Sequence, residues 1–126
     1  MGTRFVATQE CPAHPRIKGA FVNARETDTL MIYRSIKNAA RVLKNEVAEK
    51  ILSLEQEGAS LEELLTAMGG RMSRNAYQEG DVDGTIIGCG QCVGLIHKIK
   101  SVKEVIEDTI QDAQSILQRL NSMKAK

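Results

Sequence analysis

The stretch IIGCGQCVGLI, residues 86–96, encloses Gly90 and Gln91 in a C-x-x-C bracket formed by Cys89 and Cys92. Such a bracket fits a redox pair, half of a metal site, or two incidental thiols. Redox pairs normally lie at a helix N-terminus beside a βαβ unit, where the helix dipole lowers the thiol pKa. No βαβ pattern surrounds Cys89, so the sequence disfavours redox catalysis.

A second bracket, C-P-A-H at residues 11–14, raises the alternative of a zinc site. Cys11 and His14 together with Cys89 and Cys92 would supply the Cys₃His ligand set that suits tetrahedral zinc. However, the two brackets lie far apart in the chain, and Pro15 after His14 equally fits a simple loop. We therefore predict no metal site. The stretch E-G-D-V-D-G, residues 79–84, lacks the remaining ligands of a calcium loop and predicts a solvated turn.

Length and charge limit the class of protein. The chain has 126 residues, of which 42% are hydrophobic, which predicts one ordered domain at most. Residues 1–50 hold nine Lys or Arg against five acids, and residues 51–126 hold eight against eleven. This asymmetry is too mild to indicate a nucleic-acid partner, and two Phe, two Tyr and no Trp offer few stacking surfaces.

The N-terminus has no apolar core of signal-peptide length, and no window is apolar enough to span a membrane. A cytoplasmic protein without a membrane partner is therefore expected. The odd count of three cysteines indicates reduced thiols rather than a disulfide framework.

Apolar periodicity predicts a mainly α chain. Residues 4–8 read as a strand, residues 16–23 as a short helix, and residues 29–32 as a brief strand or a lead-in. A helix of five to six turns is expected from Arg34 to a stop at Gly58. No second β-rich segment is evident, so the strand at residues 4–8 pairs outside this chain, pairs weakly with residues 29–32, or is not a strand.

Two capping boxes predict further helix starts. Ser60 with Glu63 opens a short helix that ends at Gly69 and Gly70, and residues 71–79 form another one closed by Gly80. Ser101 with Glu104 opens a last helix that reaches almost to the C-terminus and carries one continuous apolar stripe. That stripe should pack against something large.

Several stretches in this order resemble the C-terminal part of the nitronate monooxygenase family, also called 2-nitropropane dioxygenases, which are FMN-dependent TIM-barrel oxidoreductases. These stretches are M-G-T-R-F (1–5), E-C-P-A-H-P (10–15), R-S-I-K-N-A-A-R-V-L-K-N (34–45), E-G-D-V-D-G (79–84) and G-Q-C-V-G-L-I (90–96). The related enoyl-acyl-carrier-protein reductase branch shares G-T-R-F, A-H-P and G-Q-x-x-G-L. The R-S-x-x-N-x-A-R-V pattern and the Cys-Pro before A-H-P favour the nitronate branch.

The resemblance implies a segment of a (β/α)₈ barrel rather than a complete one, because such barrels need about 250 residues. It implies that residues 1–8 form the last barrel strand and a phosphate-binding turn. Residues 9–84 would form a helical lid or substrate segment, and residues 85–126 a Gly-Gln loop with the closing helix.

The resemblance also implies the site residues. Met1, Gly2 and Thr3 match the turn that holds the FMN phosphate, and Gln91 matches the family glutamine that orients flavin or substrate. The family usually has small or apolar residues where Cys89 and Cys92 stand, so the thiols are not required by the shared chemistry. Neither His14 nor His97 matches the family's catalytic histidine, so no catalytic residue is assigned.

The expected function is therefore the C-terminal part of an enzyme that oxidises alkyl nitronates with O₂, inactive alone. Its partner would be the N-terminal portion of the barrel. The alternatives are a non-catalytic helical module that self-associates, and a part of an enoyl-acyl-carrier-protein reductase-like flavoenzyme.

Overall fold

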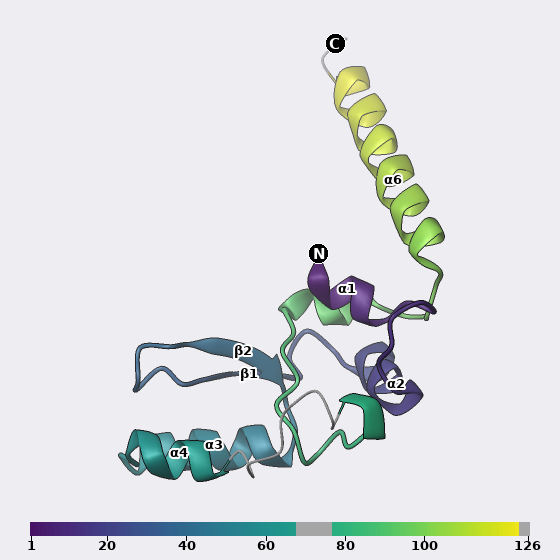
Figure 1. The fold of residues 1–126 in the computed structure, drawn as a ribbon. Coiled ribbons are helices and arrows are strands. Elements are labelled where there is room, and N and C mark those ends of the chain that lie inside the picture. The colour runs from purple at the N-terminus through teal and green to yellow at the C-terminus, as the bar shows by residue number, and fades with distance from the viewer. Residues whose placement is uncertain (68–76, 124–126) are drawn as a thin grey trace.

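Helices dominate the fold, which a computed structural model describes for residues 1–67 and 77–123 (Figure 1). Within these residues the sheet has two strands, and no closed barrel is formed. The expected mainly α segment is thus confirmed. The elements are α1 (Gly2–Val6), α2 (Pro15–Asn23), β1 (Thr29–Ile32), β2 (Ala40–Leu43), α3 (Glu46–Gln56), α4 (Leu61–Ala67), the 3₁₀ helix η1 (Gln91–Leu95) and α6 (Val102–Met123).

The N-terminal segment is helical, so the strand predicted at residues 4–8 is wrong. Helix α1 occupies most of that range, and the backbone N–H of Arg4 donates to the carbonyl of Met1 at 3.0 Å. A strand here would need a neighbour along its length, whereas a helix satisfies its backbone groups locally. Only a single bridge remains, between Thr8 and Lys100.

The long helix predicted from Arg34 is wrong in its first half. Strands β1 and β2 form an antiparallel hairpin, with Thr29 opposite Leu43 and Ile32 opposite Ala40. Helix α3 begins only after Asn45, whose side-chain oxygen accepts the N–H of Ala48 at 2.9 Å. The apolar residues spaced three to four apart therefore belong partly to strand β2 and partly to helix α3. Asn45, which caps α3, marks where the helix begins.

Other sequence predictions are confirmed. The strand at residues 29–32 is β1, the helix at residues 16–23 is α2, and Gly58 follows α3 with a positive φ of 80°. Both capping boxes form, because Ser60 and Ser101 bond reciprocally with Glu63 and Glu104. The predicted stop at Gly69 and Gly70 lies outside the described residues, as does most of the helix expected at residues 71–79.

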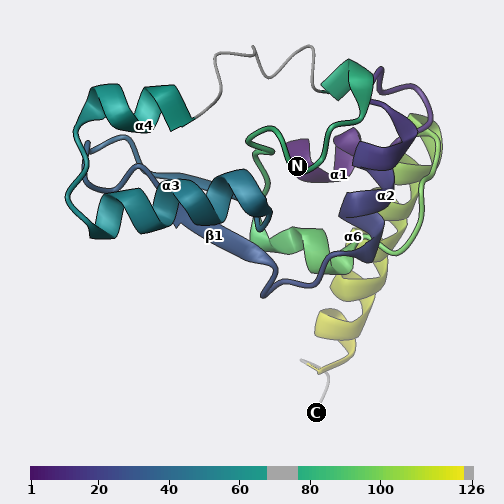
Figure 2. The same ribbon diagram turned by 90° about the horizontal axis from the view of Figure 1, so that it is seen from below.

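The chain forms two hydrophobic cores, at opposite ends of the body in Figure 2. The first core joins α2, η1 and the segment before η1, and centres on Ile17, Phe21 and Val93. The second core joins the hairpin to α3 and α4, and includes Ile32, Ile51 and Leu64. We use "body" for residues 1–67 and 77–100, which contain both cores.

Helix α6 leaves the body as a long arm, which Figures 1 and 2 both show. Val105 is its one buried residue. The stripe that was expected to pack against something large is largely exposed within the described structure. Its exposed members are Ile106, Ile110, Ile116, Leu117, Leu120 and Met123.

Among the described residues, no helix combines the length and the apolar character needed to cross a membrane.

Candidate functional site

The predicted phosphate turn lies at the exposed start of α1. Met1 and Gly2 are exposed and Thr3 is half-buried. Met1 makes no side-chain cap on the helix, and a Cβ built on Gly2 would meet nothing within 4 Å. Since the first N–H groups of a helix have no partner inside it, the amides of Gly2 and Thr3 remain available to an external acceptor.

The predicted glutamine lies beside this turn. Gln91 is the exposed first residue of η1, and the N–H of Gly90 donates to Oγ1 of Thr3 at 2.9 Å. This bond joins segments that are far apart in the sequence. The structure thus brings Thr3 beside Gly90, the residue before Gln91, and whether these residues contact a flavin stays a prediction.

The segment leading into η1 is held by strand β2. The N–H of Leu43 donates to the carbonyl of Ile87 at 2.8 Å, and the N–H of Cys89 donates to the carbonyl of Arg41 at 3.2 Å. Val42 and Gly88 form an antiparallel bridge between these contacts. The hairpin that the sequence failed to predict therefore fixes where Gly90 and Gln91 stand.

Gly94 of the G-Q-x-x-G-L motif has a packing role. A Cβ at this position would lie 2.6 Å from the backbone N of Glu26 and 3.1 Å from its Cβ. The first distance is shorter than real Cβ contacts and the second is tight, so a side chain at residue 94 would push the backbone of Glu26 away from η1. By contrast, a Cβ on Gly90 would lie 3.4 Å from Sγ of Cys92, which is ordinary contact.

The two bracketing thiols lie in different surroundings. Cys89 is buried and Cys92 is exposed. Burial, with a smaller contribution from the neighbouring Cys92, raises the pKa of Cys89 to about 11. A thiol with this pKa is almost fully protonated at neutral pH and is a poor nucleophile. Among the described residues no group of three or more His, Cys, Asp or Glu side chains could hold a metal ion, so the Cys₃His alternative is not assembled.

The histidine of C-P-A-H is a structural cap. Nδ1 of His14 accepts the N–H of Arg16 at 3.2 Å, and the backbone N–H of His14 donates to the carbonyl of Tyr77 at 2.8 Å. Its ring lies against Gly80, where a Cβ would fall 2.2 Å from Nδ1. The family stretches at residues 10–15 and 79–84 therefore meet, and they stabilise the body.

The E-G-D-V-D-G stretch is a turn, as predicted. Oδ1 of Asp81 accepts the N–H of Gly84 at 2.9 Å. The carbonyls of Val82 and Thr85 each accept a hydrogen bond from Nδ2 of Asn45 at 2.7 Å. Asn45 therefore caps α3 with one end of its amide and holds this turn with the other.

Sequence reasoning missed two further positioning residues. The carboxylate of Glu10 accepts the N–H of Val102 at 2.9 Å and 3.0 Å, so it caps α6 from outside the helix. Oε1 and Oε2 of Glu55 accept the N–H groups of Ser35 and Tyr33, at 2.9 Å and 2.7 Å. These partners are separated by long stretches of chain, so no local pattern signals them.

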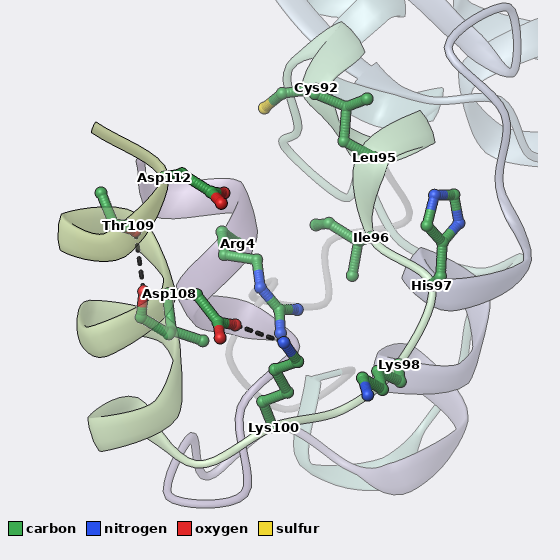
Figure 3. A pocket seen from close by; sticks show the side chains of 11 residues that line it. Arg4, Cys92, Leu95, Ile96, His97, Lys98, Lys100, Asp108, Thr109 and Asp112 are labelled. Atoms are coloured by element: carbon green, nitrogen blue, oxygen red, sulfur yellow. Dashed lines mark hydrogen bonds and ion pairs between the residues drawn. The ribbon is translucent and has the colours of Figure 1, made fainter. Parts of the chain in front are cut away.

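A pocket of about 440 Å³ lies between α1, the segment after η1 and α6 (Figure 3). Arg4, Lys98 and Lys100 bring positive charge to its lining, and Lys100 pairs with Asp108. The lining includes Cys92 but none of Met1, Gly2, Thr3 or Gln91. This pocket is therefore a neighbour of the predicted cofactor edge and not the same surface.

Comparison with known proteins decides the family. Residues 1–112 match the sequence profile of the family described as nitronate monooxygenase. The chain belongs to the nitronate monooxygenase family. The nitronate monooxygenase motifs at residues 1–5, 10–15, 34–45, 79–84 and 90–96 all fall within the matched region.

Solved structures agree with this assignment. FabK from Thermotoga maritima is similar with a TM-score of 0.87 and 35% sequence identity, over 97% of this chain and 38% of that one. A methionine-to-alanine variant of the same protein gives a TM-score of 0.76 and 35% identity, over 97% and 36% of the two chains. This member of the nitronate monooxygenase family thus spans little more than a third of the FabK chain.

Proposed function

We propose that this chain supplies the phosphate-binding edge and the Gly-Gln loop of an FMN-dependent enzyme that oxidises alkyl nitronates with O₂. One observation carries the proposal: the hydrogen bond from Gly90 to Thr3 joins the two segments to which the family resemblance gives flavin contacts. Bound FMN would accept electrons from the nitronate and pass them to oxygen.

The residues present fit the phosphate end of FMN. The amides at the start of α1 are free of partners within the helix, and Gly2 leaves open space for close approach. The hydroxyl of Thr3 uses its oxygen to accept from Gly90, so its own O–H is available to donate to a phosphate oxygen. Met1 and Gln91 would then lie at the same edge, where Gln91 would present its amide to flavin or substrate.

The N-terminal portion of a barrel would be needed to complete the site. By resemblance, the catalytic histidine and most contacts to the flavin ring belong to that portion. We therefore expect the chain alone to bind FMN weakly or not at all and to turn over no nitronate. Retention of one yellow flavin per chain with nitronate-dependent oxygen uptake would contradict this expectation.

Co-expression with the N-terminal barrel portion of a family member tests the proposed function. A yellow complex that consumes oxygen when given an alkyl nitronate is the expected result. Replacing Thr3 by Val should lower flavin retention in that complex, because the bond to Gly90 and the free O–H are both lost. Gln118→Leu, on the exposed part of α6, is the matched control and should leave flavin retention unchanged.

The enoyl-acyl-carrier-protein reductase branch is a second candidate, and the fold similarity to FabK favours keeping it. The same co-expressed complex separates the two activities. Nitronate-dependent oxygen uptake without NAD(P)H supports the first candidate, whereas NAD(P)H oxidation that depends on an enoyl thioester supports the second.

A non-catalytic, self-associating module is a third candidate, favoured by the exposed apolar stripe of α6. A colourless homo-oligomer that ignores the N-terminal barrel portion would support it.

A further inference from the structure

The segment that leads into the Gly-Gln loop, residues 85–89, runs antiparallel to β2. Its backbone hydrogen bonds to β2 share one register, in which the N–H of Leu43 donates to the carbonyl of Ile87. In an antiparallel ladder such bonds recur at every second residue. The next place in this ladder therefore lies two residues beyond Leu43 and two before Ile87, where Asn45 stands opposite Thr85.

The side chain of Asn45 fills this place in the ladder. Its Nδ2 donates to the carbonyl of Thr85 at 2.7 Å, and to the carbonyl of Val82 at the same distance. Asn45 is only 6% exposed, so water cannot readily replace these bonds. Oδ1 accepts the N–H of Ala48 at 2.9 Å, which fixes the orientation of the amide.

Burial by itself excludes only some of the other registers. Thr85, Ile87 and Cys89 are buried, and the residues between them are more exposed. A slip of one residue would turn the buried side chains outward, so this alternation opposes it. A slip of two residues keeps the same faces but moves Gly90 by about 7 Å along β2. The N–H of Gly90 would then no longer reach Oγ1 of Thr3.

We propose that Asn45 is a positioning residue for the Gly-Gln loop. Its amide selects the register in which residues 85–89 pair with β2, and that register places the N–H of Gly90 at Thr3. The functional meaning of this role rests on the proposed function, in which Thr3 and Gln91 contact the flavin. Every contact in this path lies inside the chain, so it does not depend on what covers the exposed surfaces.

Site-resolved amide hydrogen exchange, measured by NMR on the full chain without flavin, tests the proposal. Asn45→Ser keeps a side-chain oxygen that can cap α3 but removes both amide donors. The N–H groups of Cys89 and Gly90 should then exchange faster by about tenfold or more, because the register is no longer held. The amides of α3 should stay within about threefold of the wild-type rates.

Two further variants separate the register from other effects. Thr3→Val removes only the acceptor of Gly90, so it should speed the exchange of Gly90 and leave Cys89 protected by its bond to Arg41. Ser60→Ala is the matched control, because it removes a helix cap at α4 that has no part in the register. It should leave the amides of Cys89 and Gly90 within about threefold of the wild type.

The co-expressed complex distinguishes this proposal from the proposed function. Asn45→Ser should lower flavin retention in that complex, as Thr3→Val does. If Gly90 exchanges faster in Asn45→Ser while flavin retention stays at the wild-type level, the positioning role of Asn45 is supported and the proposed flavin contact of this edge is contradicted.

Either of two results would overturn the proposal. The N–H of Gly90 could exchange at the wild-type rate in Asn45→Ser, which would mean that alternating burial alone sets the register. The amides of α3 could instead speed up by the same factor as Gly90, which would mean that Asn45 only stabilises the fold.

Discussion

The body and the α6 arm differ in which groups form hydrogen bonds with their backbone. In the body, side chains from distant segments bind backbone groups, as Asn45 does at the turn of residues 82–85 and Thr3 does at Gly90. In the arm beyond its first turns, the helix relies on its own backbone bonds, and its apolar face is left exposed. The family motifs therefore supply contacts that hold the body together, whereas the apolar face of α6 makes no such contacts within the described residues.

The largest expected difference between the body and the arm is in the free energy of unfolding lost when a large apolar side chain is cut back to alanine. Phe21→Ala removes a fully buried ring from the first core and should lower the free energy of unfolding by about 3–5 kcal/mol. Leu117→Ala, at a side chain that is 60% exposed, should change it by less than about 0.5 kcal/mol. Urea unfolding followed by circular dichroism measures both. Equal losses would mean that the arm is packed in solution.

Asn45→Ala should give the next largest effect. It removes the cap of α3 and leaves the carbonyls of Val82 and Thr85 without their donor, which should cost about 2–3 kcal/mol. Asn38→Ala, at an exposed hairpin position, is the matched control and should be near neutral. If both variants unfold at the same urea concentration, Asn45 does not join the turn to α3.

Two glycines, Gly90 just before η1 and Gly94 within it, allow a finer test. Gly94→Ala should cost about 1–3 kcal/mol, since its methyl group would collide with the backbone of Glu26. Gly90→Ala should stay within about 0.5 kcal/mol, because its methyl group would meet only ordinary contacts. Thermal unfolding compares the pair, and an equal loss of stability at Gly90 would contradict the geometry.

The smallest effect is expected from Glu55 and depends on pH. Burial disfavours the charge of Glu55, but hydrogen bonds from Ser35 and from the backbone of Tyr33 outweigh it, so its pKa lies below the ordinary 4.5. A lowered pKa contributes stability that is complete above the unfolded-state pKa and is lost as pH falls through the folded-state pKa.

Glu55→Gln should therefore destabilise the chain by about 0.5–1 kcal/mol at neutral pH, a modest value because the carboxylate is partly exposed. The difference from the wild type should shrink as the pH falls below about 4.5. Urea titrations at several pH values measure it. A difference that stays constant with pH would show that the ionised carboxylate is not what holds the hairpin end.

The sequence was most informative where structure depends on near neighbours. Both capping boxes, the helix at residues 16–23 and the stop at Gly58 follow from residues a few positions apart. The order of the family motifs likewise led to the correct family, because each motif is a short run of adjacent residues that can be read directly from the sequence. The same letters did not state their roles: His14 caps a helix, and Gly94 admits the backbone of Glu26.

The sequence predictions failed where contacts between distant segments determine the secondary structure. The strand predicted at residues 4–8 had no partner and became α1. Residues 40–43 became a strand because residues 29–32 and 87–89 flank them. By itself, the sequence determined the helix caps, the apolar stripe of the last helix and the family. Only the tertiary structure decided which segments pair, that Thr3 meets Gly90, and that the stripe is left bare, because these depend on contacts between residues that no local pattern relates.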